Sequence, residues 1–302
     1  MKTKYYSHGK LLLSGEYLVL RGAEALAIPC KMGQSMTFES LDSQDLEWES
    51  WDSKNQIWFF ARFDTTSFSP IETNDSETAK RLSQILKAIR GQKKSFLVHR
   101  GGKVTTRLEF DRFWGLGSSS TLISNLALWS QTDAYQLLKN SFGGSGYDLA
   151  CTQASGPLIY QKQKTGPRVE NCIFDPPFKS HLFFVYLNQK KNSRAAIAQF
   201  DRHKTTAAQI THVSQLTRAM TRTNELKEFE EILSEHERYL GDILGIEPVQ
   251  KSRFADFPGT LKSLGAWGGD FVLAAGGDEQ TQKYFQKRGY STVLKYDEMV
   301  LG

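Results

Sequence analysis

The sequence has little of what marks secreted, membrane or metal-binding proteins. Its three cysteines, Cys30, Cys151 and Cys172, are odd in number and have no Cys-x-x-Cys spacing, which argues against a disulfide framework or a structural zinc site. Its six histidines form no paired ligand spacing. No apolar run approaches the ~20 residues that a membrane span needs, and residues 1–6 carry no signal-peptide core. We therefore expect a cytoplasmic protein with free thiols, no transition-metal site and no membrane partner.

Strong charge of one sign is also missing. The formal net charge is +5 at pH 7, and the basic residues are scattered rather than arranged in a stripe. This mild excess suits an anionic small molecule and is too weak to imply nucleic acid. The sequence shows no internal repeat, and it leaves the oligomeric state open, a homodimer included.

The residues that are present describe a globular protein of strands and helices. The chain of 302 residues is 39% apolar and 24% charged, enough to bury a large core in two domains. Residues 161–177 are polar and contain prolines, which favours a domain junction there. Apolar periodicity predicts strands within 5–20, 21–29, 36–63, 95–99, 103–110, 157–160 and 181–187, and helices after 121, from 195 and at 77–90, 133–140, 206–223 and 226–244.

The chain is organised around a loop where an extended segment meets an apolar helix: Gly115-Leu116-Gly117-Ser118-Ser119-Ser120-Thr121. Its two glycines allow positive φ and close approach of a ligand. The unpaired N–H groups and the positive dipole end of the helix point into the loop, so an anion is the natural occupant. One hydroxyl could ligate a Mg²⁺ ion that bridges phosphates. The loop therefore predicts a phosphate cradle.

Other interpretations of this loop are weaker or less specific. It is not a Walker loop, because no Gly-Lys-Ser/Thr follows the spacer, and it is not the dinucleotide fingerprint, because Ser120 stands where the third glycine is needed. Taken alone, it could still be an N-capped helix after a tight glycine turn.

The loop does not stand alone, because Gly115–Thr121 resembles the second signature of the GHMP kinases, a superfamily named for galactokinase, homoserine kinase, mevalonate kinase and phosphomevalonate kinase. The run from His8-Gly9-Lys10 to Gly15-Glu16-Tyr17 is similar to the first signature. The resemblance implies that Lys10 lies near the transferred phosphate and pairs with a catalytic aspartate, and that Glu16 and Tyr17 belong to the substrate site. The Glu16-Tyr17 pair is closer to the phosphomevalonate kinase form. Without the resemblance, Lys10 could be a solvated lysine at a strand end.

A glycine-rich segment supplies the candidate aspartate. Three glycines within residues 143–146 do not favour a helix or a strand. The run Gly-Ser-Gly-Tyr-Asp that ends at Asp148 resembles the Gly-Ser-Gly-Phe/Val-Asp segment of isoprenoid kinases. This implies that Asp148 is the base, or that it orients the acceptor hydroxyl and Lys10, with Ser145 beside the substrate. Asp148 could instead cap the next helix.

Residues 261–274 resemble the third signature, in which a lysine precedes a glycine-rich turn and a strand. The resemblance places Gly268, Gly269 and Asp270 in the substrate site, and Asp270 again favours phosphomevalonate kinases. Taken alone, the stretch is a glycine turn between two buried segments.

Two positions depart from the family pattern. Leu137 stands where mevalonate kinases carry a Mg²⁺-binding glutamate, which leaves Ser119, nucleotide oxygens and water as ligands. Trp267 replaces a signature glycine, and its ring could form a pocket wall.

A cluster of cations follows the apolar strand at 181–187. Lys190, Lys191 and Arg194 precede a predicted helix, which makes a combined charge and helix-terminus anion site. The family places substrate contacts on the corresponding turn, and Arg194 could hold a phosphate bidentately. A solvated basic turn is an equally open interpretation of Lys190 and Lys191.

The resemblance implies an α/β fold in two layers. Residues 1–170 would form an ATP-binding domain similar to domain 2 of ribosomal protein S5, and residues 171–302 a ferredoxin-like domain. It also implies ATP and Mg²⁺ as cofactors and transfer of the γ-phosphoryl group to phosphomevalonate or mevalonate. A non-catalytic nucleotide-binding protein of the same superfamily, or a kinase for a sugar or an amino acid, stays open.

Overall fold

A computed structural model describes residues 2–98, 100–189, 193–200, 205–267 and 269–302. The chain forms two compact units that interleave in sequence. Unit 1 consists of Met1–Gly9, Met32–Arg112 and Leu116–Gln153, and unit 2 of Lys10–Lys31, Phe113–Gly115 and Ala154–Gly302. The predicted division at residue 170 stays a prediction.

The described residues form runs of strands and runs of helices along the chain. The strands are β1 (Lys2–Leu12), β2 (Ala25–Ser40), β3 (Asp45–Trp51), β4 (Ile57–Asp64), β5 (Pro70–Thr73), β6 (Gly102–Leu108), β7 (Leu158–Gln163), β8 (Gly166–Asn171), β9 (Phe183–Tyr186), β10 (Thr260–Ser263), β11 (Phe271–Ala275) and β12 (Val293–Lys295). The helices are α1 (Ser76–Gln92), α2 (Ser118–Ser130), α3 (Ala134–Ser141), α4 (Tyr147–Thr152), α5 (Ser193–Phe200), α6 (Ala207–Met220), α7 (Leu226–Leu244), α8 (Val249–Arg253), α9 (Thr281–Gln286) and α10 (Tyr296–Met299), with 3₁₀ turns η1 (Leu18–Arg21) and η2 (Lys179–His181). Within the described residues, no helix is long and apolar enough to cross a membrane. The three cysteines are thiols rather than disulfides.

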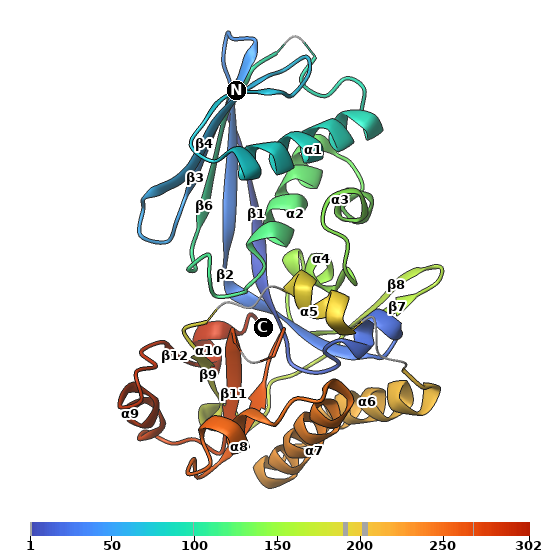
Figure 1. Cartoon of the computed structure of the whole chain (residues 1–302), viewed down its shortest axis with the longest axis vertical. Coiled ribbons are helices and arrows are strands. Elements are labelled where there is room, and N and C mark those ends of the chain that lie inside the picture. Colours follow the sequence, from blue (N-terminus) through green and yellow to red (C-terminus); the bar gives the residue numbers. More distant parts are fainter. Residues whose placement is uncertain (1, 99, 190–192, 201–204, 268) are drawn as a thin grey trace. The chain divides into compact units, whose positions relative to one another are not determined.

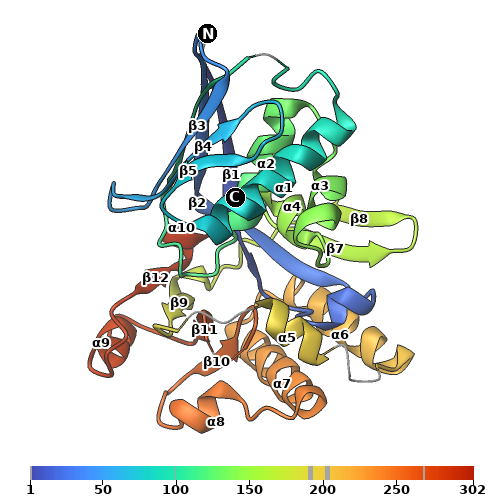
Figure 2. The same ribbon diagram turned by 45° about the horizontal axis from the view of Figure 1, so that its top comes forward.

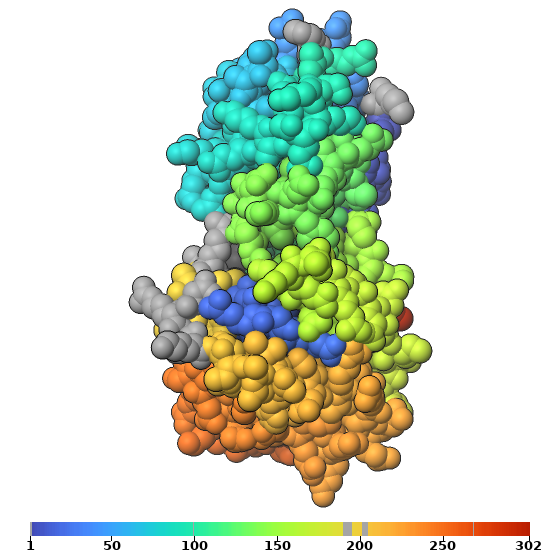
Figure 3. All heavy atoms as spheres, turned by 90° about the vertical axis from the view of Figure 1, so that its right-hand side faces the viewer, coloured from blue at the N-terminus to red at the C-terminus, as the bar shows by residue number. Residues whose placement is uncertain are grey.

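Unit 1 is a sheet with helices on one face. Its strands pair in the order β5-β4-β3-β6-β2, and β1 also pairs with β2. Strand β3 runs parallel to β6 and antiparallel to β4. Helices α1, α2 and α3 lie on the same side of this sheet in Figure 1 and face the viewer in Figure 3.

Side-chain alternation explains how this sheet buries one face. Leu46 and Trp48 of β3, and Phe59, Ala61 and Phe63 of β4, are buried at every second position, as a half-buried antiparallel pair requires. Helix α1 completes the core with an apolar stripe at helical spacing that comprises Ala79, Leu82, Ile85, Leu86 and Ile89.

Unit 2 contains a smaller antiparallel sheet in the order β10-β11-β9-β12. Strands β9 and β11 are buried at every position, so their sequences are continuous apolar runs. Helices α6 and α7 lie side by side in both ribbon views (Figures 1 and 2). In the same unit, the first part of β2 pairs with β7, and β7 pairs with β8.

Two sequence predictions about secondary structure were wrong. The expected second strand within 5–20 is the 3₁₀ turn η1. Residues 95–98 of the strand expected at 95–99 form turns, and residue 99 lies outside the described residues. In both cases the apolar pattern was too short to fix the backbone conformation, which tertiary packing decides. Residues 161–177 contain most of the β7–β8 hairpin, and the domain junction expected there stays a prediction.

Candidate functional site

The glycine loop has the local geometry that its sequence predicts. Gly115 and Gly117 have φ of 71° and 89°, in the left-handed region that side chains with a Cβ atom avoid. Gly117 is the N-cap of α2, which starts at Ser118. The loop therefore leads straight into the first turn of a 13-residue helix, where backbone N–H groups lack intrahelical partners.

The four hydroxyls of the loop divide into two kinds. The Oγ atom of Ser120 donates to the carbonyl of Gly117 at 3.0 Å, and Oγ1 of Thr121 lies 2.8 Å from Oε1 of Gln34. Both side chains are buried, so they stabilise the helix start. Ser118 is half-buried and Ser119 is exposed, and in the described part of the chain neither hydroxyl has a hydrogen bond. These two hydroxyls are therefore available to a ligand.

Buried polar contacts within unit 1 hold α2 in place. Asn125 accepts a hydrogen bond from Ser7 at 2.8 Å and donates to the carbonyl of Gln34 at 2.9 Å. The side-chain amide of Gln153 donates to the hydroxyls of Ser7 and Ser124 at 2.9 and 3.2 Å. Ser7, Ser124 and Asn125 are buried, whereas Gln153 is exposed. The buried, satisfied groups fix the rotation of α2 and hence the direction of its first N–H groups.

Gly115 is a glycine for a second reason, which the sequence did not reveal. A Cβ atom at this position would lie 2.8 Å from Cγ of Asp270 and 2.9 and 3.0 Å from its two carboxylate oxygens. Both residues belong to unit 2. The carboxylate of the third signature therefore packs against the backbone of the second.

The chain around Gly115 is anchored to the smaller sheet of unit 2. The carbonyl of Phe113 accepts a hydrogen bond from the hydroxyl of Tyr186 at 3.1 Å. The ring of Trp114 packs edge-on against Phe271, with ring centroids 5.8 Å apart. Residues 113–115 are thus held by β9 and by β11, the strand that carries the end of the third signature.

Tyr17 and Asp270 are both buried in unit 2, near enough for the Asp270 charge to act on the Tyr17 phenol. They are 9% and 7% exposed, and both have positive φ, 62° and 53°. Burial raises the pKa of Tyr17 to about 12, and the charges of Glu16 and Asp270 contribute to the same shift. The first and third signatures are therefore close together in unit 2. Gly269 is buried beside Asp270, whereas Gly268 lies outside the described residues.

Glu16 is a buried, ion-paired residue, whereas the sequence suggested a residue that contacts the substrate. It is 1% exposed, and its carboxylate is ion-paired with the ammonium of Lys262, which is fully buried. The sequence places Lys262 in the third signature, but no site role was assigned to it. Its position in an apolar strand, where a lysine needs a partner, was the signal that could have found it.

The two predicted catalytic residues belong to different units. Lys10 is half-buried on β1 in unit 2, near Cys30, whose thiol has its pKa raised by burial to about 12 despite the lysine charge. Asp148 is half-buried in the first turn of α4 in unit 1. Gly146, with φ of 92°, is the N-cap of this helix, so Asp148 does not cap it. The pairing of Lys10 with Asp148, and the contact of Ser145 with substrate, stay predictions.

The predicted cation cluster is largely outside the described residues. Lys190 and Lys191 are not described, and Arg194 is described only as part of the backbone of α5. Its role in binding an acceptor phosphate stays a prediction.

A magnesium site would have few protein ligands here. Leu137 is fully buried in the core of unit 1, so it offers apolar surface where a carboxylate is expected. Among the described residues, no group of three or more His, Cys, Asp or Glu side chains could hold a metal ion. The exposed hydroxyl of Ser119 fits a Mg²⁺ ion whose remaining ligands are nucleotide oxygens and water.

Trp267 is buried in unit 2, and the pocket wall suggested for its ring stays a prediction. It is 3% exposed, has φ of 45°, and packs in a cluster with Tyr17, Phe200, Val213 and Leu240. The indole therefore lies in the same core cluster as Tyr17 of the first signature, at a position where the third signature has a glycine.

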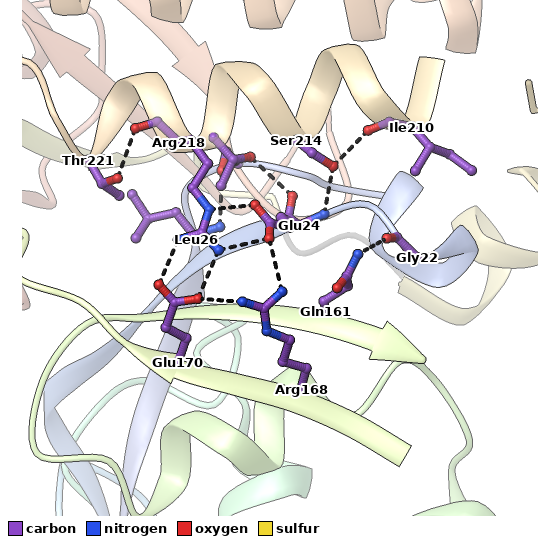
Figure 4. A network of polar contacts seen from close by, with 12 residues as sticks. Gly22, Glu24, Leu26, Gln161, Arg168, Glu170, Ile210, Ser214, Arg218 and Thr221 are labelled. Carbon is purple, nitrogen blue, oxygen red and sulfur yellow. Dashed lines mark hydrogen bonds and ion pairs between the residues drawn. The ribbon is translucent and has the colours of Figure 1, made fainter. Parts of the chain in front are cut away.

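Glu24, which directly precedes β2, is tied to α6 by charged groups (Figure 4). The guanidinium of Arg218 donates to both carboxylate oxygens of Glu24, at 2.6 and 2.8 Å, and to Glu170 at 2.7 and 2.9 Å. Nη2 of Arg168 lies 3.1 Å from Oε2 of Glu170. A hollow of about 770 Å³ opens beside this network, and its lining includes Glu24 and Arg218 but none of the predicted site residues.

Comparisons with known proteins identify the fold. No family model matches the sequence, and no curated protein matches it. Solved structures match over nearly the whole chain. A mevalonate kinase superposes with a TM-score of 0.71 at 14% identity, over 99% of this chain and 100% of that chain.

Two further kinases with different acceptors share the fold. Phosphomevalonate kinase from Streptococcus pneumoniae, in complex with phosphomevalonate and AMPPNP, has a TM-score of 0.70 at 16% identity, over 97% of this chain and 99% of that chain. Galactokinase from Lactococcus lactis, in complex with galactose, has a TM-score of 0.69 at 11% identity, over 100% and 94%. The predicted α/β fold of the GHMP kinases is therefore confirmed. The finer descriptions of the two predicted domains stay predictions.

Proposed function

We propose that this protein is an ATP-dependent phosphotransferase that moves the γ-phosphoryl group of ATP to an isoprenoid-pathway acceptor, phosphomevalonate or mevalonate. The observation that carries the proposal is the glycine loop: two left-handed glycines lead into a fixed helix start with two available hydroxyls, within the fold of the GHMP kinases. Such a helix start binds phosphate through its backbone N–H groups and its dipole.

The proposed parts suit the chemistry of phosphoryl transfer. Catalysis of this reaction rests on positioning and on stabilising the charge of the transferred group. The backbone at 115–118 and the hydroxyls of Ser118 and Ser119 would hold the nucleotide phosphates. Lys10 would stabilise the transferred phosphoryl group, and Asp148 would orient or deprotonate the acceptor hydroxyl. A Mg²⁺ ion, bound through Ser119, would neutralise phosphate charge.

The identity of the acceptor is the most specific part of the proposal. Structures of this fold include kinases of mevalonate, phosphomevalonate and galactose, so the fold alone does not name the acceptor. The resemblance of the Glu16-Tyr17 pair and of Asp270 to the phosphomevalonate kinase signatures favours that acceptor. The cations around Arg194 suit an acceptor with a carboxylate and a phosphate. We therefore place phosphomevalonate first and mevalonate second.

The test is ADP release with a panel of acceptors at matched Mg-ATP. The wild-type protein should release ADP with phosphomevalonate or mevalonate, and Ser119→Ala should lose turnover while it stays folded. Ser76→Ala is the matched control, because Ser76 is also an exposed serine at the start of a helix but follows no glycine turn. Equal turnover of both variants and the wild type would contradict the assigned role of the loop.

A second candidate is a non-catalytic nucleotide-binding protein. The buried Leu137 and the core position of Trp267 favour it, because both replace features of active family members. Binding of Mg-AMPPNP by calorimetry, together with no ADP release on any acceptor, would select this candidate. ADP release with a sugar or an amino acid alone would select a different acceptor class.

A further inference from the structure

A buried ion pair joins two segments that are far apart in sequence. The ammonium of Lys262 on β10 donates to Oε1 of Glu16, a residue 246 positions away, and to the carbonyl of Ser263 at 2.9 Å. Lys262 is 0% exposed and Glu16 is 1% exposed. Both belong to unit 2, so the link is internal to one compact body.

Two neighbouring residues of α7 hold the same two segments. His236 accepts a hydrogen bond from the backbone N–H of Gly15 through Nε2 at 3.0 Å. Glu237 accepts from the backbone N–H of Ser263 at 2.9 Å and from its hydroxyl at 2.8 Å. Helix α7 therefore contacts the first signature with one side chain and the strand of the third signature with the next.

The position of these polar groups is costly, which calls for an explanation. Burial raises the pKa of Glu16 and of Glu237 and lowers that of His236, while Lys262 opposes the shift of both carboxylates. A buried ion pair gains little net stability over apolar residues of similar volume. The cluster is therefore better explained by the positions in which it fixes the two segments than by a gain in the free energy of folding.

Both joined segments carry parts of the proposed site. Glu16 follows Lys10 by six residues and directly precedes Tyr17. Lys262 lies on the strand that leads to Asp270, and the carboxylate of Asp270 packs against Gly115 of the glycine loop. The ion pair thus connects the Lys10 segment with the residue that borders the glycine loop.

We propose that Glu16 and Lys262 are positioning residues, which hold the Lys10 segment and the Asp270 turn in fixed relation for phosphoryl transfer. They act through these segments, and this replaces the direct substrate contact that the sequence suggested for Glu16. The inference rests on the proposed function for its catalytic part. The displacement of a reacting group by about 1 Å can cost about 100-fold in rate, so a loosened link has a measurable effect.

The test compares single and double variants of the pair. Glu16→Gln and Lys262→Met should each unfold at lower urea concentration, because each leaves one buried charge unpaired. The double variant Glu16→Gln/Lys262→Met removes both charges and should recover most of the unfolding midpoint. We expect its kcat to stay about 10-fold to 100-fold below that of the wild type, with KM for Mg-ATP changed less. A double variant with wild-type stability and wild-type kcat would overturn the proposal.

Two variants of His236 probe the same link and leave the ion pair intact. Gln can present an acceptor near the position of Nε2, so His236→Gln should keep the bond from Gly15, whereas His236→Leu removes it. We expect kcat to fall in His236→Leu and to be rescued in His236→Gln. Equal kcat in both, at comparable stability, would count against the positioning role even if the double variant of the pair failed to fold.

Amide hydrogen exchange gives a readout that needs no turnover. In the double variant, residues 13–19 and 263–267 should exchange faster than in the wild type, while other parts of unit 2 keep their protection. Unchanged exchange in these segments would overturn the proposal. If the wild type releases no ADP with any acceptor, the proposed function fails, and hydrogen exchange alone decides whether the pair fixes the two segments.

Discussion

Replacing Gly115 by alanine should destabilise unit 2 through two separable effects. The first is conformational, because φ of 71° is unfavourable for any residue with a Cβ atom by about 1–2 kcal/mol. The second is steric, because the new Cβ atom would lie 2.8 Å from Cγ of the buried Asp270. Overpacking of this kind typically costs about 1–3 kcal/mol, so we expect a total loss of about 2–5 kcal/mol in the free energy of unfolding.

Gly245→Ala is the matched control for the conformational effect. Gly245 has φ of 66° and lies in the same unit, and a Cβ atom added there would meet no other atom within 4 Å. It ends α7 as a left-handed C-cap, so its replacement should cost only about 1–2 kcal/mol. The difference between the two variants measures the clash with Asp270.

Urea unfolding at about 25 °C, followed by tryptophan fluorescence, measures both losses. A double-mutant cycle with Asp270→Ala then tests the cause, because removal of the carboxylate should relieve part of the clash and make the two changes less than additive. If Gly115→Ala and Gly245→Ala lose the same free energy, or if the cycle is strictly additive, the close packing of Asp270 against the loop is refuted.

Three other predictions concern catalysis and pH. Asp148→Asn and Lys10→Met should each lower kcat by about 10²–10⁴, with a less than additive loss in the double variant, and full additivity would argue against a shared step. Arg194→Ala should lower kcat/KM for phosphomevalonate about tenfold more than for mevalonate, and an equal loss for both would contradict a phosphate contact. Burial holds the pKa of His236 well below its usual value, so the unfolded chain takes up the proton first and the free energy of unfolding should decrease as pH falls below about 6.5. Urea titrations should show that the wild type loses about 1 kcal/mol of unfolding free energy between about pH 7.5 and 5.5 through this group, and that His236→Gln loses less. An identical pH dependence in the variant and the wild type would show that His236 is not its source.

The sequence alone predicted the elements that are determined by residues a few positions apart. The amphipathic stripe of residues 77–90 became α1, and the span predicted at 226–244 became α7 with the same ends. The glycine loop was predicted with its positive φ values and its helix start, because two glycines and a following apolar helix act over a few residues. Short local patterns were less reliable, as the 3₁₀ turn at Leu18–Arg21 shows.

Long-range packing, in contrast, determined which distant groups meet. No periodicity links Glu16 with Lys262, or Gly115 with Asp270, because each contact closes a long loop of chain and depends on how whole elements pack. His236 and Glu237 lie on the buried face of α7, and the prediction of a helix at 226–244 singled out neither residue and named none of their partners. The sequence could thus name the three signature segments, whereas the partners that hold their parts together in unit 2 depend on the tertiary fold, where a buried charge is tolerated only beside its counter-ion.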